Sequence, residues 1–230
     1  MKITQRVITG TEPRLSPRDQ LLLRPDMPNF SQRNRFLPFR GDKYCGPVSV
    51  ANEIAWLAKH DLRFQPLFPT ERKPEELILE LGEKMKTSYR GTRDEGLLDG
   101  LKQFTGKRRF DIYPELFEMG YTQVLHDFGN DIMQTILEAG GNIDLGITYY
   151  SNDPIDRFDM QKRHYVSVRG FDEKARHFLI NDPDSYERKS IPVKLHSSIT
   201  PDGYMALEYD AYSESPLAYV DFAMGYYVYS

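Results

Sequence analysis

The hydrophobic periodicity of this chain changes once, near residue 141, and that change limits the folds the chain can adopt. Before residue 141, apolar residues recur every three to four positions, which is typical of amphipathic helices. After it, apolar and polar residues alternate, which is typical of half-buried strands. Helices followed by a mostly antiparallel sheet predict an α+β fold. The expected helices cover 45–60, 74–87, 92–106 and 130–141, and the expected strands cover 142–150, 164–171, 177–182, 190–195 and 216–230.

The chain has 230 residues, a length that suits one domain better than two. Residues 1–40 hold five prolines without a sustained period, which predicts an extended arm that wraps the domain. We therefore expect a single domain over 1–230, with the arm at 1–40, a helical half at 41–140 and a sheet half at 141–230. A cleft is expected between the two halves. Thr92 and Glu95 match a capping box at the start of the third expected helix.

The composition excludes several classes of protein. With 40% hydrophobic and 28% charged residues, the chain is expected to be globular. Its net charge of -4 provides no basic surplus for a nucleic-acid partner. No stretch approaches the ~18 apolar residues that span a bilayer, and the first residues lack the apolar run of a signal peptide. We expect no membrane span and a cytoplasmic location, and export without a cleaved signal stays open.

Cofactor and metal chemistry find little support in the sequence. The chain has one cysteine, which excludes an internal disulfide. The scattered histidines cannot complete a zinc site around one thiol. No glycine-rich loop of the phosphate-binding kind occurs. We therefore expect neither a cofactor nor a metal.

Cys45 is the candidate nucleophile because it stands at or just before the first expected helix. Pro47 falls in the first turn of that helix, where its missing N–H costs nothing. A thiolate at a helix N-terminus is stabilised by the helix dipole, which lowers the pKa of the thiol. The backbone N–H of Cys45 points where an oxyanion could form, and Gly46 would leave room for a substrate chain. The alternative is that Cys45 is an ordinary small buried residue.

His164 is the candidate base because it opens the alternating strand HYVSVRGF, which leads into a second strand, HFLIND. A turn centred on Glu173 would pair residues whose numbers sum to 346, and Asp182 would then lie opposite His164 on the same face. A register shifted by one would bring Asn181 or Pro183 opposite instead. A carboxylate beside an imidazole holds its tautomer and stabilises the imidazolium, as a catalytic triad requires. The alternative is an ordinary polar pair across two strands.

Two stretches resemble a known family. Residues 44–58, YCGPVSVANEIAWLA, resemble the nucleophile helix of the double-glycine peptidases that cleave bacteriocin leaders. Residues 164–183, HYVSVRGFDEKARHFLINDP, resemble the second motif of that family. The resemblance covers about half of the chain.

This resemblance implies a papain-like fold, a peptide or protein substrate, and a triad of Cys45 as nucleophile, His164 as general base and Asp182 as orienting acid. Phytochelatin synthases and transglutaminases share the order Cys, His, Asp. Hydrolysis of peptide or isopeptide bonds and acyl transfer to an amine therefore both stay open.

One departure from the papain-like pattern concerns the oxyanion hole. Such enzymes commonly carry a Gln five or six residues before the nucleophile, and here Arg40 and Phe39 occupy those positions. The nearest side-chain amides are Asn34 and Gln32, and Arg40 is a third candidate donor. If none of these serves, the chain could be a catalytically degenerate domain that only binds a peptide or protein.

Overall fold

The computed structural model describes residues 22–119, 123–150, 160–172, 177–184, 191–199, 205–208 and 218–230. The helical elements are η1 (Pro38–Gly41), α2 (Cys45–His60), η2 (Leu62–Leu67), α3 (Pro74–Lys84), α4 (Asp94–Gly106) and α5 (Gln123–Glu138). The strands are β1 (Asp111–Met119), β2 (Asn142–Tyr150), β3 (Met160–Asp172), β4 (His177–Asn181), β5 (Ile191–Ile199), β6 (Met205–Glu208) and β7 (Ala218–Tyr229).

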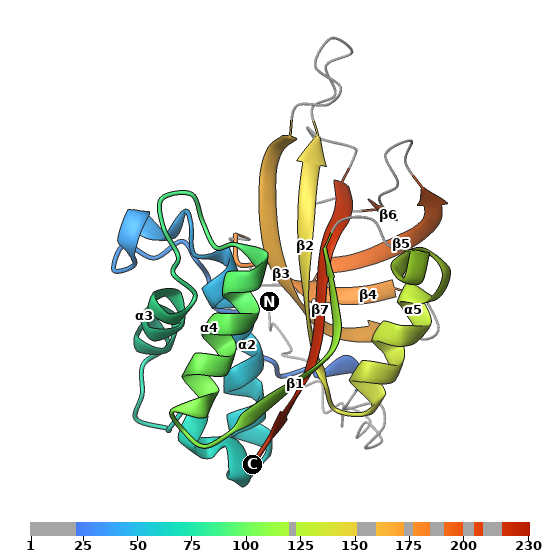
Figure 1. Ribbon diagram of the computed structural model, residues 1–230. Coiled ribbons are helices and arrows are strands. Elements are labelled where there is room, and N and C mark those ends of the chain that lie inside the picture. Colours follow the sequence, from blue (N-terminus) through green and yellow to red (C-terminus); the bar gives the residue numbers. More distant parts are fainter. Residues whose placement is uncertain are drawn as a thin grey trace, which may run out of the picture.

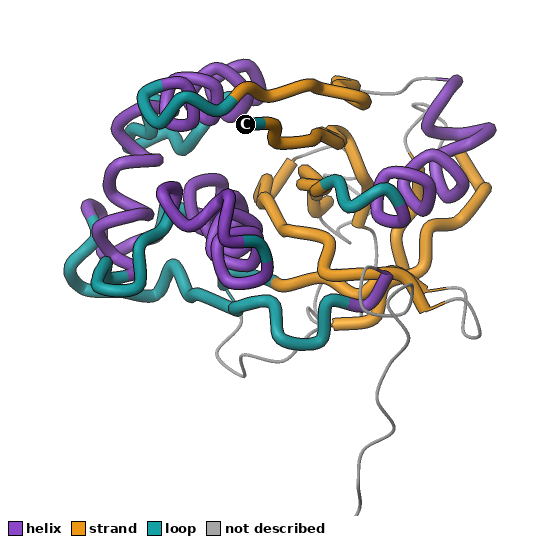
Figure 2. Tube along the Cα trace, turned by 90° about the horizontal axis from the view of Figure 1, so that it is seen from below, coloured by secondary structure: helices purple, strands orange, loops and turns teal. Residues whose placement is uncertain are grey.

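The strands form one antiparallel sheet in the order β1-β7-β2-β3-β4-β5-β6. Because β6 also pairs with β7, six of the strands close into a ring, and β1 extends the sheet beyond it. Helices α2, α3 and α4 lie on one side of this sheet and α5 lies on the other (Figure 1). Viewed along the strands, the sheet curves around an interior on the side away from the three helices (Figure 2). The α+β class predicted from the sequence is confirmed.

The alternation of β7 separates two hydrophobic cores. Phe222, Met224 and Tyr226 belong to the core formed with α2, α3 and α4. Val220 and Ala223 belong to the second core, which also contains residues of α5. Side chains of opposite parity leave a regular strand on opposite faces, which separates Ala223 from Phe222 and Met224. Val220 has the parity of Phe222 but belongs to the second core, because the pairing of β7 with β2 shifts between Phe222 and Val220. Strand β7 therefore forms the wall between the two cores.

The expected change from helix to strand at residue 141 is wrong for one element: strand β1 lies within the segment predicted to be helical and pairs with β7. Helix α5 lies before residue 141 as expected, but it begins at Gln123 rather than at residue 130. Pro114 concealed strand β1 because proline normally interrupts a ladder. It is tolerated here because β1 is an edge strand, and a register shift between Pro114 and Leu116 interrupts the pairing with β7.

The predicted capping box is also wrong. Helix α4 begins at Asp94, and its N-cap residue Arg93 makes no side-chain capping bond. The hydroxyl of Thr92 instead lies 2.7 Å from that of Thr87. Asp94 and Glu95 occupy the first turn, where negative charge interacts favourably with the helix dipole.

Residues 22–40 of the expected N-terminal arm are described, and residues 1–21 lie outside the described part. The arm packs on the domain through residues 22–34. Buried Arg24 donates to the side chain of Asn142 at 2.8 Å. The backbone N–H of Phe30 donates to Asn52 of α2 at 2.7 Å. The side chain of Asn181 in β4 donates to the carbonyl of Pro28 at 2.8 Å. This segment therefore connects β2, α2 and β4.

The contact between α3 and α4 provides a stability test. A Cβ atom at Gly100 would lie 2.5 Å from the backbone nitrogen of Met85, and that backbone cannot move aside as a flexible side chain could. We expect Gly100→Ala to reduce the free energy of unfolding by about 1–3 kcal/mol, measured by urea denaturation. Gly106→Ala, at the end of the same helix, has no atom within 4 Å of the added methyl. It should leave stability unchanged or raise it by up to about 1 kcal/mol; equal losses in both variants would contradict this account of the packing.

Candidate active site

Cys45 is the first residue of α2. The side chain of the N-cap residue Tyr44 makes no capping hydrogen bond, so it does not occupy any backbone N–H group of the first helical turn. The cysteine is 8% exposed. A Cβ at Gly46 would lie 2.9 Å from Leu97 and 3.2 Å from the hydroxyl of Thr92. Gly46 is therefore required by the close approach of α4, a role the sequence did not suggest.

The hairpin of β3 and β4 brings His164 and Asp182 together. The His164 Nε2 atom lies 2.5 Å from the Asp182 Oδ1 atom, and both residues are buried. The predicted register was wrong, because Ser167 pairs with Asn181 and the pairing shifts between Val168 and Gly170. Continued one residue beyond the end of β4, this register would place Asp182 opposite Val166, two residues from His164. A shift of two keeps both side chains on one face, where diagonal neighbours are within reach.

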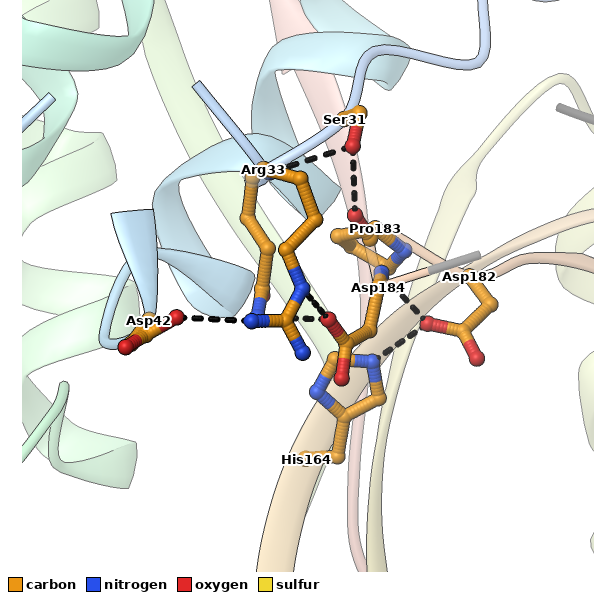
Figure 3. Close-up of polar contacts among 8 residues, drawn as sticks. Ser31, Arg33, Asp42, His164, Asp182, Pro183 and Asp184 are labelled. Carbon is orange, nitrogen blue, oxygen red and sulfur yellow. Dashed lines mark hydrogen bonds and ion pairs between the residues drawn. The ribbon is translucent and has the colours of Figure 1, made fainter. Parts of the chain in front are cut away.

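The Asp182 carboxylate is held from a second direction. Its Oδ1 atom also accepts a hydrogen bond of 2.7 Å from the backbone N–H of Asp184 (Figure 3). A carboxylate fixed by a backbone donor and an imidazole has little freedom to rotate. The ring of His164 is therefore fixed in orientation by its partner.

Cys45 and His164 lie close enough for each to shift the pKa of the other. Because Nε2 faces Asp182, Nδ1 is the ring nitrogen left for the sulfur. Burial acts to lower the pKa of His164, but the charge and hydrogen bond of Asp182, together with Cys45, outweigh it and raise that pKa to about 10. Burial likewise acts to raise the pKa of Cys45, but His164 and the backbone of Tyr165 and Gly46 lower it below its ordinary value. Both shifts favour a thiolate beside an imidazolium.

The three candidate oxyanion donors have different surroundings. Gln32 is buried, and its Nε2 atom donates to Asp184 at 3.3 Å. Asn34 donates instead to Glu75 of α3 at 3.1 Å, and its carbonyl accepts from the N–H of Phe36. Arg40 is exposed within η1. Of the three, Gln32 is the one whose side chain contacts the turn after β4, which also carries Asp182.

A polar network beside His164 was not foreseen from the sequence. Arg163 lies 2.8 Å from the carboxylate of Asp94 and 2.9 Å from that of Asp221. Burial acts to lower the pKa of Arg163, but Tyr165 and the two carboxylates outweigh it and raise that pKa above its ordinary value. The hydroxyl of Tyr165 also donates to Asp94. The network ties β3 to α4 and β7 on both sides of His164. Its members come from three distant segments, so no local pattern could have identified them.

Among the residues that the structure describes, no three His, Cys, Asp or Glu side chains are grouped so that they could hold a metal ion. Within the same residues, no helix is both long and apolar enough to cross a membrane.

Comparison with known proteins identifies the family. The peptidase domain of Streptococcus ComA, a bifunctional ABC transporter involved in a quorum-sensing pathway, is 18% identical over 81% of this chain and 91% of that chain, with a TM-score of 0.35. A search of curated proteins found no match. The sequence model of the Peptidase C39-like family matches residues 25–200, which include Cys45, His164 and Asp182. This match confirms the resemblance inferred from the sequence motifs, and the chain belongs to the Peptidase C39-like family, a family of cysteine peptidases.

Proposed function

We propose that this peptidase cleaves peptide bonds through a thioester on Cys45, with His164 as general base and acid and Asp182 as the residue that orients it. The observation that carries the proposal is the buried hydrogen bond between His164 and Asp182, with Cys45 at the start of α2 interacting with the same imidazole. All three side chains are buried from bulk water, which strengthens the interactions between them.

The reaction follows from this arrangement. The Cys45 thiolate attacks the carbonyl carbon, and the electron pair of the carbonyl moves onto its oxygen. The His164 imidazolium gives its proton to the leaving amine as the C–N bond breaks, which leaves an acyl thioester. His164 then takes a proton from water, and the resulting hydroxide displaces the thiolate and releases the acid. Asp182 stays ionised and holds the ring.

The proposed oxyanion donors are the backbone N–H of Cys45 and the side-chain amide of Gln32. A tetrahedral oxyanion normally receives two hydrogen bonds, and the nucleophile supplies one. Gln32 is supported by its burial and by its contact with Asp184, two residues from Asp182. An amide nitrogen carries two N–H groups, so the bond to Asp184 leaves one for the substrate.

The test uses the fact that Cys45 is the sole cysteine of the chain, so thiol labelling reports on it alone. We expect iodoacetamide to alkylate the wild type rapidly at pH 6, where an ordinary thiol is almost wholly protonated. We also expect cleavage of fluorogenic peptides with two glycines before the scissile bond, the substrate class suggested by the family resemblance. Mass spectrometry of products formed with an added amine distinguishes hydrolysis from acyl transfer. Slow alkylation together with no turnover would refute the peptidase proposal and favour a binding domain.

The oxyanion donor can be identified by comparing matched variants. Gln32→Ala is expected to lower kcat by roughly 100-fold, because one oxyanion hydrogen bond is worth about that much. Alkylation at pH 6 should not change, since that reaction needs no oxyanion stabilisation. Asn34→Ala and Arg40→Ala should remain within a few-fold of the wild type. A large loss in either of these, with Gln32→Ala unaffected, would assign the donor differently.

A further inference from the structure

A second buried carboxylate lies two residues after Asp182 and has no part in the chemistry above. The Asp184 side chain is 3% exposed. Its carboxylate accepts from the Gln32 amide at 3.3 Å and forms an ion pair with the Arg33 guanidinium. Its backbone N–H donates to Asp182. Asp184 thus contacts both the candidate oxyanion amide and the candidate triad acid.

The contacts around Asp184 join two segments that are distant in the sequence. The carbonyl of Pro183 accepts from the N–H of Gln32 at 2.9 Å and from the Ser31 hydroxyl at 3.2 Å. Arg33 also pairs with Asp42 at 2.7 Å, three residues before Cys45 (Figure 3). The N-terminal segment is therefore fixed on the turn that carries Asp182 and on the loop that leads to the nucleophile.

The chemistry of the contact determines which end of the Gln32 amide faces Asp184. A carboxylate only accepts hydrogen bonds, so it attracts the amide nitrogen and repels the amide oxygen. The Gln32 Oε1 atom is buried and has no hydrogen-bond partner in the described structure, so no donor opposes this choice. Without the carboxylate, the amide could turn over and present an acceptor to a developing oxyanion.

We infer that Asp184 is a positioning residue, which orients the Gln32 amide for the oxyanion and does so from the turn that also carries Asp182. The inference rests on the proposed function, because an oxyanion donor matters only if acyl chemistry occurs. The ion pair with Arg33 offsets the cost of burying the Asp184 charge. One carboxylate thereby couples the geometry of the acid to that of the oxyanion donor.

The first test is a double-mutant cycle on kcat/KM with the full chain. Asp184→Ala is expected to lower kcat/KM by roughly 10- to 100-fold, mainly through kcat. In a Gln32→Ala background the same change should cost less than about two-fold, because the group it positions is gone. Asp184→Asn keeps an acceptor oxygen for the Gln32 amide, so its loss of kcat/KM should be smaller than that of Asp184→Ala. Asp42→Asn is the matched control; it removes the exposed partner of Arg33 and should leave kcat/KM within about two-fold.

The second readout does not need turnover. A peptide aldehyde adds to Cys45 as the S–C bond forms and the carbonyl electron pair moves to oxygen, so its affinity reports on the oxyanion donors. We expect Asp184→Ala, and less so Asp184→Asn, to weaken aldehyde binding by about 10-fold or more, with alkylation at pH 6 unchanged.

The outcomes separate the inference from the proposed function. Additive losses of kcat/KM in the double-mutant cycle, or slower alkylation in both Asp184 variants, would mean that Asp184 acts through His164 or through the fold. Either result would overturn the inference and leave the peptidase proposal intact. A wild type that neither turns over peptides nor binds the aldehyde would overturn both.

Discussion

Replacing Cys45 with alanine is expected to lower kcat for peptide cleavage by at least roughly 10⁴-fold, the largest effect of any single change in this chain. Cys45 is the only cysteine, so no second thiol can take over the attack. The activity that remains should come from substrate binding and oxyanion stabilisation alone. The measurement is steady-state cleavage of a fluorogenic peptide, with intact mass spectrometry to show that no acyl-enzyme forms.

Cys45→Ser is the matched control for this change. Serine keeps the size of the side chain and a hydrogen-bonding group for His164, but its hydroxyl does not ionise beside an imidazolium as a thiol does. We expect a comparably inactive protein with a thermal midpoint close to that of the wild type. Cleavage that persisted in both variants would show that Cys45 is not the nucleophile.

The elements that the sequence predicted well are those determined by local pattern. The helix that begins at Cys45 and the strand at 142–150 agree with α2 and β2 because their apolar residues follow a single unbroken period. Strand β1 escaped prediction because Pro114 is tolerated only at a sheet edge, and edge position is a property of the whole sheet. The hairpin register failed because the assumed turn centre was wrong: the numbers of the paired residues Asp172 and His177 sum to 349 rather than to the 346 that a turn centred on Glu173 requires. The irregularity between Val168 and Gly170 then changes that sum by one.

The candidate site shows the same division. Cys45, His164 and Asp182 could be selected from their local settings, but the contact of Gln32 with Asp184 could not. Gln32 lies farther from Cys45 in sequence than the usual position, and the intervening loop folds back on itself. Gly41 has a φ of 86°, and a Cβ there would lie 1.5 Å from the carbonyl oxygen of Gln32. This close approach brings Gln32 back toward the start of α2 and is accessible to glycine alone.

A buried pair of acids, Glu53 and Asp144, underlies the second large prediction. Glu53 stands two helical turns after Cys45 on α2, and Asp144 projects from β2. Glu53 accepts from the Tyr226 hydroxyl at 2.5 Å and from the N–H of Ile143 at 2.9 Å, and Ser49 donates to Asp144. These bonds fasten α2, and with it the nucleophile, to β2 and β7.

Glu53→Ala is expected to reduce the free energy of unfolding by about 3–5 kcal/mol. The change leaves the Tyr226 hydroxyl and the Ile143 N–H without their acceptor in the core. Glu53→Gln keeps the shape of the side chain and one acceptor oxygen. It should reduce the free energy of unfolding by less than half of the loss in the alanine variant. Urea denaturation at pH 6 measures both, and a loss below about 1 kcal/mol for the alanine variant would show that the pair does not fasten the helix.

The same pair should make stability depend on pH. Burial, followed by the charge of Asp144, raises the pKa of Glu53, and burial raises the pKa of Asp144 to about 7. Among the described residues, Arg24 and Tyr226 also interact with the pair. Carboxyls in the unfolded chain titrate near ~4, so between that pH and about 7 the folded state binds more protons than the unfolded state. The stability due to this proton is fully present below about pH 4 and is lost as the pH rises through about 7, at about 1.4 kcal/mol per pH unit for one proton.

Asp144→Asn tests that slope directly. The amide keeps an acceptor for Ser49 and offers Glu53 a hydrogen bond without requiring a shared proton. We expect the stability of this variant, relative to that of the wild type, to rise by about 2.5 kcal/mol from pH 5 to pH 8, measured by urea denaturation at each pH. Asp99→Asn, on the exposed face of α4, is the control and should change stability by less than about 0.5 kcal/mol throughout. Parallel pH curves for the wild type and Asp144→Asn would show that Asp144 does not take up a proton on folding.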